Sequence, residues 1–182
     1  MVQVVLAATL RHKETQQELA VVTTHLKARR GALLSTLRAE QGADLLQWLA
    51  SVLPRPATPL VITGDLNAPP SEAVVAGVLT RGSRLPLTSA YPLDTLGWST
   101  WKVSCDWRAA GHVTPTLTLI GRQVRDTGEE KHVLDYILHS PASVRTLAVL
   151  DPPPPEAVGE ARLPSLQFPS DHLSLVADLA IL

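Results

Sequence analysis

Polar side chains of types that could do chemistry lie at or beside the ends of several apolar segments. They are His25, the pair Asp65 and Asn67 in GDLNAPP, Asp135 within KHVLDYIL, and the neighbours Asp171 and His172 in PSDHLSLV. Carboxylates, an amide and histidines without a cysteine cluster suit a hard ion such as Mg²⁺ better than zinc. Because side chains converge where strand ends meet at one edge of an α/β sheet, the pattern predicts one magnesium-assisted site. A phosphate as substrate would fit it, since positioning and charge stabilisation do most of the catalysis of phosphoryl transfer.

A basic trio begins with the first of these residues. His25, Lys27 and Arg29 could donate three hydrogen bonds to one phosphate, but a solvated turn after a strand explains them equally well. The GDLNAPP segment could likewise be only a turn. Asp135 could be a structural hydrogen-bonding group or could orient a histidine. The combination of sites in one chain is therefore stronger evidence than any single one.

Composition limits the class of protein. The 182 residues suggest one domain, and 16 basic against 17 acidic residues, a net charge of -1, argue against a general polyanion-binding surface. The single cysteine, Cys105, excludes an intramolecular disulfide and suits a reducing compartment, so we expect a cytoplasmic location and leave mitochondrial and nuclear ones open. No segment is apolar for long enough to cross a bilayer. The start, VQVVLAATL, lacks the features of a signal peptide and predicts a strand.

Alternating strands and helices are expected to position these side chains. Two β-branched runs predict a hairpin whose second strand ends at His25, and apolar spacing between Leu34 and Leu53 predicts a helix with Gly42 as its weak point. A short buried strand then precedes Gly64, and Ser71 is expected to cap a helix that ends near Leu79. Further strands are expected at 100–103, 131–138, 143–150 and 173–181, with a Pro-rich loop at 151–167. The predicted class is α/β with an excess of strands.

Five segments in order carry a resemblance to a known family. TTHLKAR, VITGDLNAPP, TWK, HVLDYIL and RLPSLQFPSDHLSLV resemble motifs of the endonuclease/exonuclease/phosphatase superfamily, and the first and last are most similar to its nocturnin group. The match covers about residues 2–103 and 130–180. The resemblance implies that residues 1–182 form the C-terminal part of a four-layer α/β sandwich.

The resemblance also implies a role for the phosphate-binding residues. His25 would hydrogen-bond a phosphate oxygen with help from Lys27 and Arg29, and Asn67 would hold the phosphate or the attacking water.

For the reacting groups, the resemblance implies that Asp65 orients or activates the water. Asp135 would fix the tautomer of His172, which would stabilise the transferring phosphoryl group or assist proton transfer. The metal ligands implied are Asp65, Asn67 and Asp171, with Mg²⁺ as the cofactor.

Proteins of the nocturnin group are Mg²⁺-dependent phosphohydrolases, associated with removing the 2'-phosphate of NADP(H) or with shortening 3' poly(A) of mRNA. The resemblance implies one or both substrates here. The alternative is a truncated, non-catalytic phosphate- or RNA-binding regulatory protein. A serine hydrolase is disfavoured because the chain has no G-x-S-x-G elbow. The oligomeric state is left open.

Two departures from the family pattern lead us to expect that the isolated chain is inactive. The match begins at the hairpin before THLKAR, whereas the first half of the family domain, with its metal-binding glutamate, lies before this point in the family. Glu14 and Glu18 lie in or beside the hairpin turn, and we assign neither as the metal ligand. Residues 104–127 have no counterpart and are expected to form an exposed loop or extra hairpin. Ser104 stands where the family has an arginine that reaches the substrate.

Overall fold

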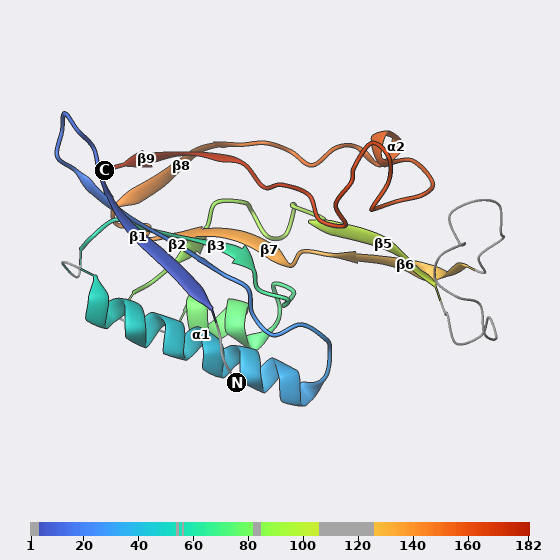
Figure 1. The fold of residues 1–182 in the computed structure, drawn as a ribbon, viewed down its shortest axis with the longest axis horizontal. Coiled ribbons are helices and arrows are strands. Elements are labelled where there is room, and N and C mark those ends of the chain that lie inside the picture. Colours follow the sequence, from blue (N-terminus) through green and yellow to red (C-terminus); the bar gives the residue numbers. More distant parts are fainter. Residues whose placement is uncertain (1–3, 54, 56, 82–84, 106–125) are drawn as a thin grey trace.

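Three sheets make up the fold in the computed structural model, which describes residues 4–53, 55, 57–81, 85–105 and 126–182. The largest sheet has the strand order β1-β2-β3-β7-β4 (Figure 1). Its strands are β1 (Val5–Arg11), β2 (Glu18–Thr24), β3 (Leu60–Asp65), β4 (Thr88–Ser89) and β7 (Asp135–His139). The smaller sheets pair β5 (Thr100–Cys105) with β6 (Asp126–His132), and β8 (Val144–Val149) with β9 (Ala177–Ile181).

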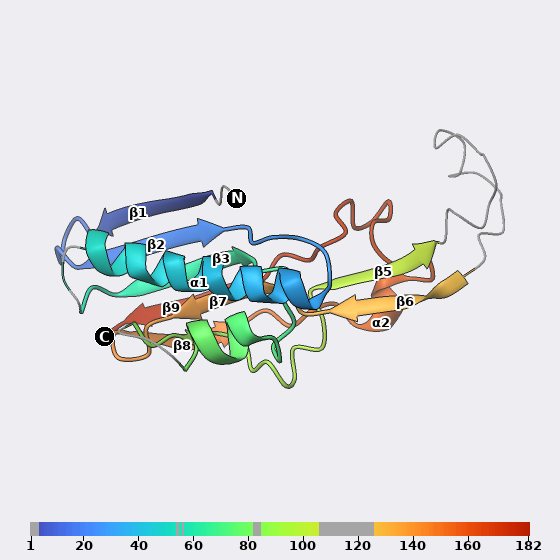
Figure 2. The ribbon, with the colours of Figure 1, turned by 90° about the horizontal axis from the view of Figure 1, so that it is seen from below.

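One long helix covers a face of the five-stranded sheet. Helix α1 (Ala32–Val52) connects the parallel strands β2 and β3, which need a crossover of this kind. Figure 2 shows α1 in front of the sheet, beside the short π-helix η1 (Val74–Leu79). The predicted weak point, Gly42, is buried against η1, where an added Cβ would lie 2.8 Å from Val74 Cγ2. Its small size therefore lets the two helices approach each other.

The opposite face of the sheet is covered by β8 and β9. Leu175, Ala177 and Leu179 pack against the main core, which also contains Leu49 and Ile62. The protein thus has three layers here, with the five-stranded sheet in the middle (Figure 1). Within the described ranges, no helix is long and apolar enough to span a membrane.

The Pro-rich loop forms a second, smaller core with the start of β5. It contains helix α2 (Pro155–Val158), and Val158 and Leu163 pack against Trp98 and Trp101. The two tryptophan rings meet edge to face with centroids 5.1 Å apart.

Strand β1 lies at the edge of the main sheet and pairs only with β2 among the strands described. Leu6 and Leu10 are 68% and 54% exposed. An edge strand without inward charges or proline is a template for pairing with another chain.

Two predicted elements were wrong in detail. Ser71 does not cap the short helix, which begins at Val74 without a side-chain cap. The strand expected at 131–138 is divided, because β6 ends at His132 and β7 begins at Asp135 in a different sheet. The physical reason is the serine at position 99, whose hydroxyl accepts the backbone N–H groups of residues 134 and 135 in place of a neighbouring strand.

The expected 104–127 insertion lies mostly outside the described residues. Residues 104 and 105 extend β5, and residues 126 and 127 begin β6. The ends of this segment therefore belong to the hairpin that carries it.

Candidate functional site

Two carboxylates meet at the end of the main sheet. Asp65 is the last residue of β3 and Asp135 the first of β7, and the antiparallel register places them directly opposite each other. Because β2 runs parallel to β3, the residue after β2 reaches the same end. That residue is His25, whose Nε2 lies 3.4 Å from Asp65 Oδ2.

The fourth member comes from the segment before β9. His172 Nδ1 lies 2.8 Å from Asp135 Oδ2, and its Nε2 lies 4.0 Å from Asp65 Oδ2. The expected hydrogen bond between Asp135 and the His172 ring is therefore present. The imidazole stands between two carboxylates, and we name His25, Asp65, Asp135 and His172 the strand-end cluster.

The start of β5 holds His172 in place. Thr100 forms a β-bridge with His172, and its hydroxyl donates to the Asp171 carbonyl at 2.7 Å. The Leu173 N–H donates to the Ser99 carbonyl at 2.8 Å. The position of the imidazole thus depends on the small β5–β6 sheet.

Ser99 is a site residue that the sequence reasoning missed. Its fully buried hydroxyl lies 2.6 Å from Asp135 Oδ2 and accepts the N–H groups of Leu134 and Asp135 at 2.9 and 3.1 Å. It therefore fixes the carboxylate that orients His172. The only signal in the sequence was a serine just before a predicted strand, which is too common to point to a site.

The backbone geometry of the GDLN segment, residues 64–67, explains why Gly64 and Asn67 occupy their positions. Gly64 has φ 141°, and a Cβ there would lie 1.9 Å from the Thr24 carbonyl oxygen, so only glycine fits. Asn67 adopts φ 50°, a conformation that asparagine tolerates better than most residues. Its N–H donates to Asp65 Oδ1 at 2.8 Å, and its side-chain amide donates to the Leu26 carbonyl at 3.1 Å.

Burial raises the pKa of Asp65 above its ordinary value of 3.8. The Asn67 N–H opposes this shift, the Asp135 charge adds to it, and His172 and His25 oppose it. Asp65 is therefore a better proton acceptor than an exposed aspartate.

Besides Asn67, three predicted site residues lie outside the strand-end cluster. Asp171 pairs with Lys102 at 2.5 Å, and this hydrogen bond lowers the pKa of the Asp171 carboxyl. Lys27 and Arg29 lie in the loop after His25. Within the part of the chain that the structure describes, neither side chain forms a hydrogen bond or ion pair with the cluster. The roles predicted for these three residues stay predictions, as do those of the cluster residues.

The donor atoms of the cluster allow a test of fit for a metal. One ligand atom each from Asp65, Asp135 and His172 lie within 4.8 Å of one another. Asp135 and His172 form a hydrogen bond with each other, whereas Asp65 offers a carboxylate. The side-chain N–H of Asn67 donates to the Leu26 carbonyl, which leaves the Asn67 amide oxygen for a ligand. A carboxylate and an amide oxygen fit Mg²⁺, which keeps several waters in protein sites.

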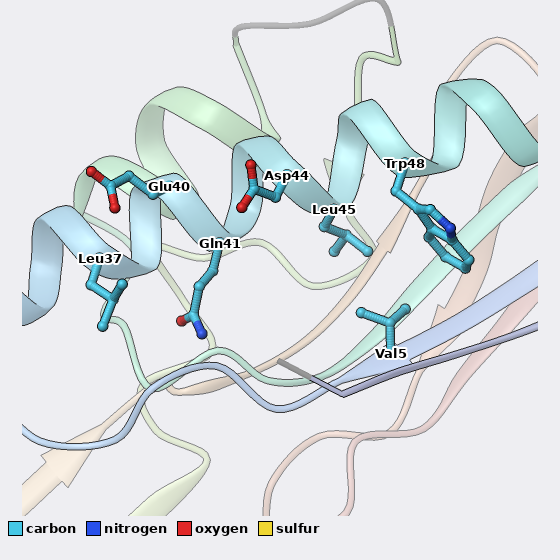
Figure 3. A pocket seen from close by; sticks show the side chains of 7 residues that line it. All are labelled: Val5, Leu37, Glu40, Gln41, Asp44, Leu45 and Trp48. Atoms are coloured by element: carbon cyan, nitrogen blue, oxygen red, sulfur yellow. The ribbon is translucent and has the colours of Figure 1, made fainter. Parts of the chain in front are cut away.

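Two hollows lie away from the strand-end cluster, between α1 and the β1–β2 hairpin. One, of about 390 Å³, is lined by residues of α1 and by Val5, and contains no member of the strand-end cluster (Figure 3). Figure 3 shows Gln41, Leu45 and Trp48 on the side of α1 that faces β1, with Glu40 and Asp44 turned away from it. The strand-end cluster thus lies apart from both hollows, at the ends of the inner strands β3 and β7.

The amino-acid sequence is similar to those of several known proteins. The model of the Endonuclease/Exonuclease/phosphatase family matches residues 6–172. Nocturnin of Drosophila melanogaster is 39% identical over 183 residues, covering 99% of this chain and 28% of that protein. Nocturnin of Homo sapiens is 39% identical over 178 residues, covering 98% of this chain and 37% of that protein.

A solved structure agrees with these matches. The human Nocturnin catalytic domain with bound sulfate anion has a TM-score of 0.69 and 32% identity, covering 99% of this chain and 53% of that one. The predicted fold class is confirmed. This chain spans between about a quarter and two fifths of the length of the curated relatives, from 28% to 41%.

Proposed function

The chain belongs to the endonuclease/exonuclease/phosphatase family, and from this premise we propose that it carries the proton-transfer and phosphate-binding part of a Mg²⁺-dependent phosphohydrolase. The substrates we propose are the 2'-phosphate of NADP(H), the 3' poly(A) of mRNA, or both.

The observation that carries this proposal is the position of His172 between two carboxylates. Asp135 accepts from Nδ1 at 2.8 Å, so the other ring nitrogen, Nε2, is directed toward Asp65 at 4.0 Å. Held in this way, Nε2 accepts a proton when the imidazole is neutral, and the imidazolium form can donate a proton or hydrogen bond through Nε2 to a phosphoryl oxygen.

Asp65 is suited to act on the attacking water. The Asn67 N–H holds Oδ1, which leaves Oδ2 facing the two histidines and able to accept a hydrogen bond from the water. His25 lies on the other side of Asp65 from the Asp135 carboxylate and can donate to a second phosphate oxygen.

Asp65 and Asn67 are the residues we propose to hold Mg²⁺, with water completing its coordination. When bound, the ion supplies neutralisation of the charge on the phosphoryl oxygens. Asp171 would join only if it left Lys102.

Two observations support a phosphate as the group bound. Lys27 and Arg29 follow His25 in one loop and could add positive charge beside the cluster. The human nocturnin domain was solved with a bound sulfate, a tetrahedral anion like phosphate.

The test measures phosphate release from NADP and shortening of labelled poly(A), with Mg²⁺ or with EDTA. We expect no turnover by the 182-residue chain alone. We expect Mg²⁺-dependent turnover by a version extended upstream through the region that precedes the match in its relatives. His172→Ala and Asp65→Ala should abolish this turnover, whereas His12→Ala, in the β1–β2 turn, should not.

Turnover that persists in both cluster variants would refute the proposed mechanism. Binding of NADP or poly(A) that requires His25, without turnover in either version, would instead support the non-catalytic alternative. Neither binding nor turnover would refute both.

A further inference from the structure

A buried arginine on α1 joins the two loops that carry the candidate site. Arg38 is 2% exposed, and Nε and Nη2 donate to the two carboxylate oxygens of Glu72 at 2.6 and 2.8 Å. Its Nη1 donates to the carbonyls of Lys27 and Arg29 at 2.9 and 2.8 Å. The guanidinium thus bonds one loop through a carboxylate and the other through its backbone.

The first loop carries the proposed phosphate-binding residues. It follows β2 and includes Arg29 at φ 81°, a backbone conformation that non-glycine residues rarely adopt without support. The neighbouring Gln41 of α1 also accepts the Lys27 N–H at 3.1 Å. The helix therefore holds this loop through both Arg38 and Gln41.

The second loop follows the GDLN segment. Glu72 lies between Asn67 and η1, and Asn67 in turn donates to the Leu26 carbonyl in the first loop. The Arg38–Glu72 pair and the Asn67 contact are therefore two separate ties between the same two loops.

From this geometry we propose that Arg38 is a positioning residue for the substrate phosphate. By binding the carbonyls of Lys27 and Arg29, it sets the backbone that presents His25, Lys27 and Arg29 to one anion. The inference rests on the proposed phosphate site and adds to it a residue that touches neither substrate nor metal.

Arginine is the residue type that this task requires. Its planar fork can bind a carboxylate through two nitrogens and still donate from the third, whereas a lysine is a point charge with one ammonium. Arg38→Lys should therefore keep a positive charge near Glu72 but lose the bonds to the loop carbonyls.

A positioning role must be separated from a purely structural one. Arg38→Met leaves the Glu72 carboxylate without its partner and can unfold the chain. The double variant Arg38→Met with Glu72→Gln removes both charges, and replacing a buried ion pair in this way is often tolerated. We expect the double variant to fold with near wild-type stability while the loop after β2 is no longer held.

The first readout is limited digestion of the 182-residue chain with trypsin, which cuts after Lys27, Arg29 and Arg30. Cleavage at these positions should be about tenfold faster or more in the folded double variant than in the wild type, because a loop without its tertiary bonds opens more often. The matched control is Arg55→Met, which removes an exposed arginine paired with Glu18 and should leave cleavage unchanged.

The second readout is binding of NADP to the same proteins. A charge-assisted hydrogen bond to an anion that is lost or misplaced weakens binding about tenfold to 100-fold, so we expect the affinity to fall by this factor in the double variant and in Arg38→Lys.

The outcomes separate the two proposals. A folded double variant with wild-type cleavage and wild-type NADP affinity would overturn the role of Arg38 while the proposed function stands. Faster cleavage with unchanged affinity would overturn it too, since the loop would be loosened without consequence. If the wild type binds neither NADP nor labelled poly(A), the phosphate site fails and the positioning role with it, whereas the cleavage result would still measure the hold of Arg38 on the loop.

Discussion

Replacing Gly64 by alanine should break the sheet at the point where the site is assembled. Gly64 lies on β3 at φ 141°, one residue before Asp65, and β3 runs beside β2 in parallel. An added Cβ would lie 1.9 Å from the Thr24 carbonyl oxygen and 3.0 Å from its carbonyl carbon. Both are backbone atoms, so no side-chain rotation can relieve the contact.

The size of the effect follows from this geometry. A real Cβ atom essentially never lies closer than 3.0 Å to another heavy atom, whereas this one would lie at 1.9 Å. Strands β2 and β3 must therefore move apart, or residue 64 must change its backbone conformation. Separation would lose one or two ladder hydrogen bonds at about 1 kcal/mol each, and alanine at this φ adds about 1–3 kcal/mol of strain. We expect a loss of roughly 2–5 kcal/mol in unfolding free energy, which is a melting-temperature shift of about 4–20 °C for a chain of this size.

Urea unfolding followed by circular dichroism would measure this loss, and two other glycines serve as controls. Gly77→Ala, with nothing within 4 Å of the new Cβ, should be neutral or stabilising by about 0.5–1 kcal/mol because glycine is unfavourable within a helix. Gly42→Ala, 2.8 Å from the movable Val74 side chain, should fall between the two. A Gly64→Ala protein within 1 kcal/mol of the wild type would refute the reasoning.

Three further predictions concern the cluster and the sheet edge. Because burial raises the pKa of Asp65, its ionised form reduces stability at pH above that pKa, and this cost disappears as the pH falls toward the ordinary value of 3.8. Asp65→Asn should therefore stabilise the protein more at pH 7 than at pH 3 in urea titrations, and the reverse order would contradict the burial argument. Ser99→Ala leaves Asp135 and two buried N–H groups without their partner, so thermal unfolding should show a loss of about 1–3 kcal/mol, and a loss below 0.5 kcal/mol would argue against this role. Leu6→Lys on the exposed edge strand β1 should lower aggregation, measured by light scattering, without lowering the melting temperature. Unchanged aggregation would show that the chains do not associate through β1.

The sequence was sufficient for the parts of the fold that depend on local patterns. The hairpin, α1 and β3 follow from apolar spacing, and the strand-end positions of His25 and Asp65 follow from those elements. The division at Val133 and Leu134 could not be predicted, because an apolar run is equally compatible with one strand or two.

Within the site, the sequence could identify polar residues but not their partners. Asp171 and His172 are neighbours on an extended segment, where adjacent side chains point in opposite directions, and only His172 faces the cluster. Arg38 was missed because arginine on a helix is usually exposed, and only a tertiary structure shows its bonds to two loops. Ser99 was missed for the same reason, since its importance lies entirely in contacts far along the chain.

The wide spacing of the cluster along the chain has a consequence for its assembly on the ribosome. Asp65 and His172 are separated by about 100 residues, so at about 5–20 residues per second the histidine is added on the order of 5–20 s after the aspartate. Asp135 is added 37 residues before His172, late in that interval, so both carboxylates are in the chain before the imidazole that stands between them. A nascent chain thus contains both carboxylates before His172, and the strand-end cluster is complete only when the segment leading into β9 has docked on Thr100.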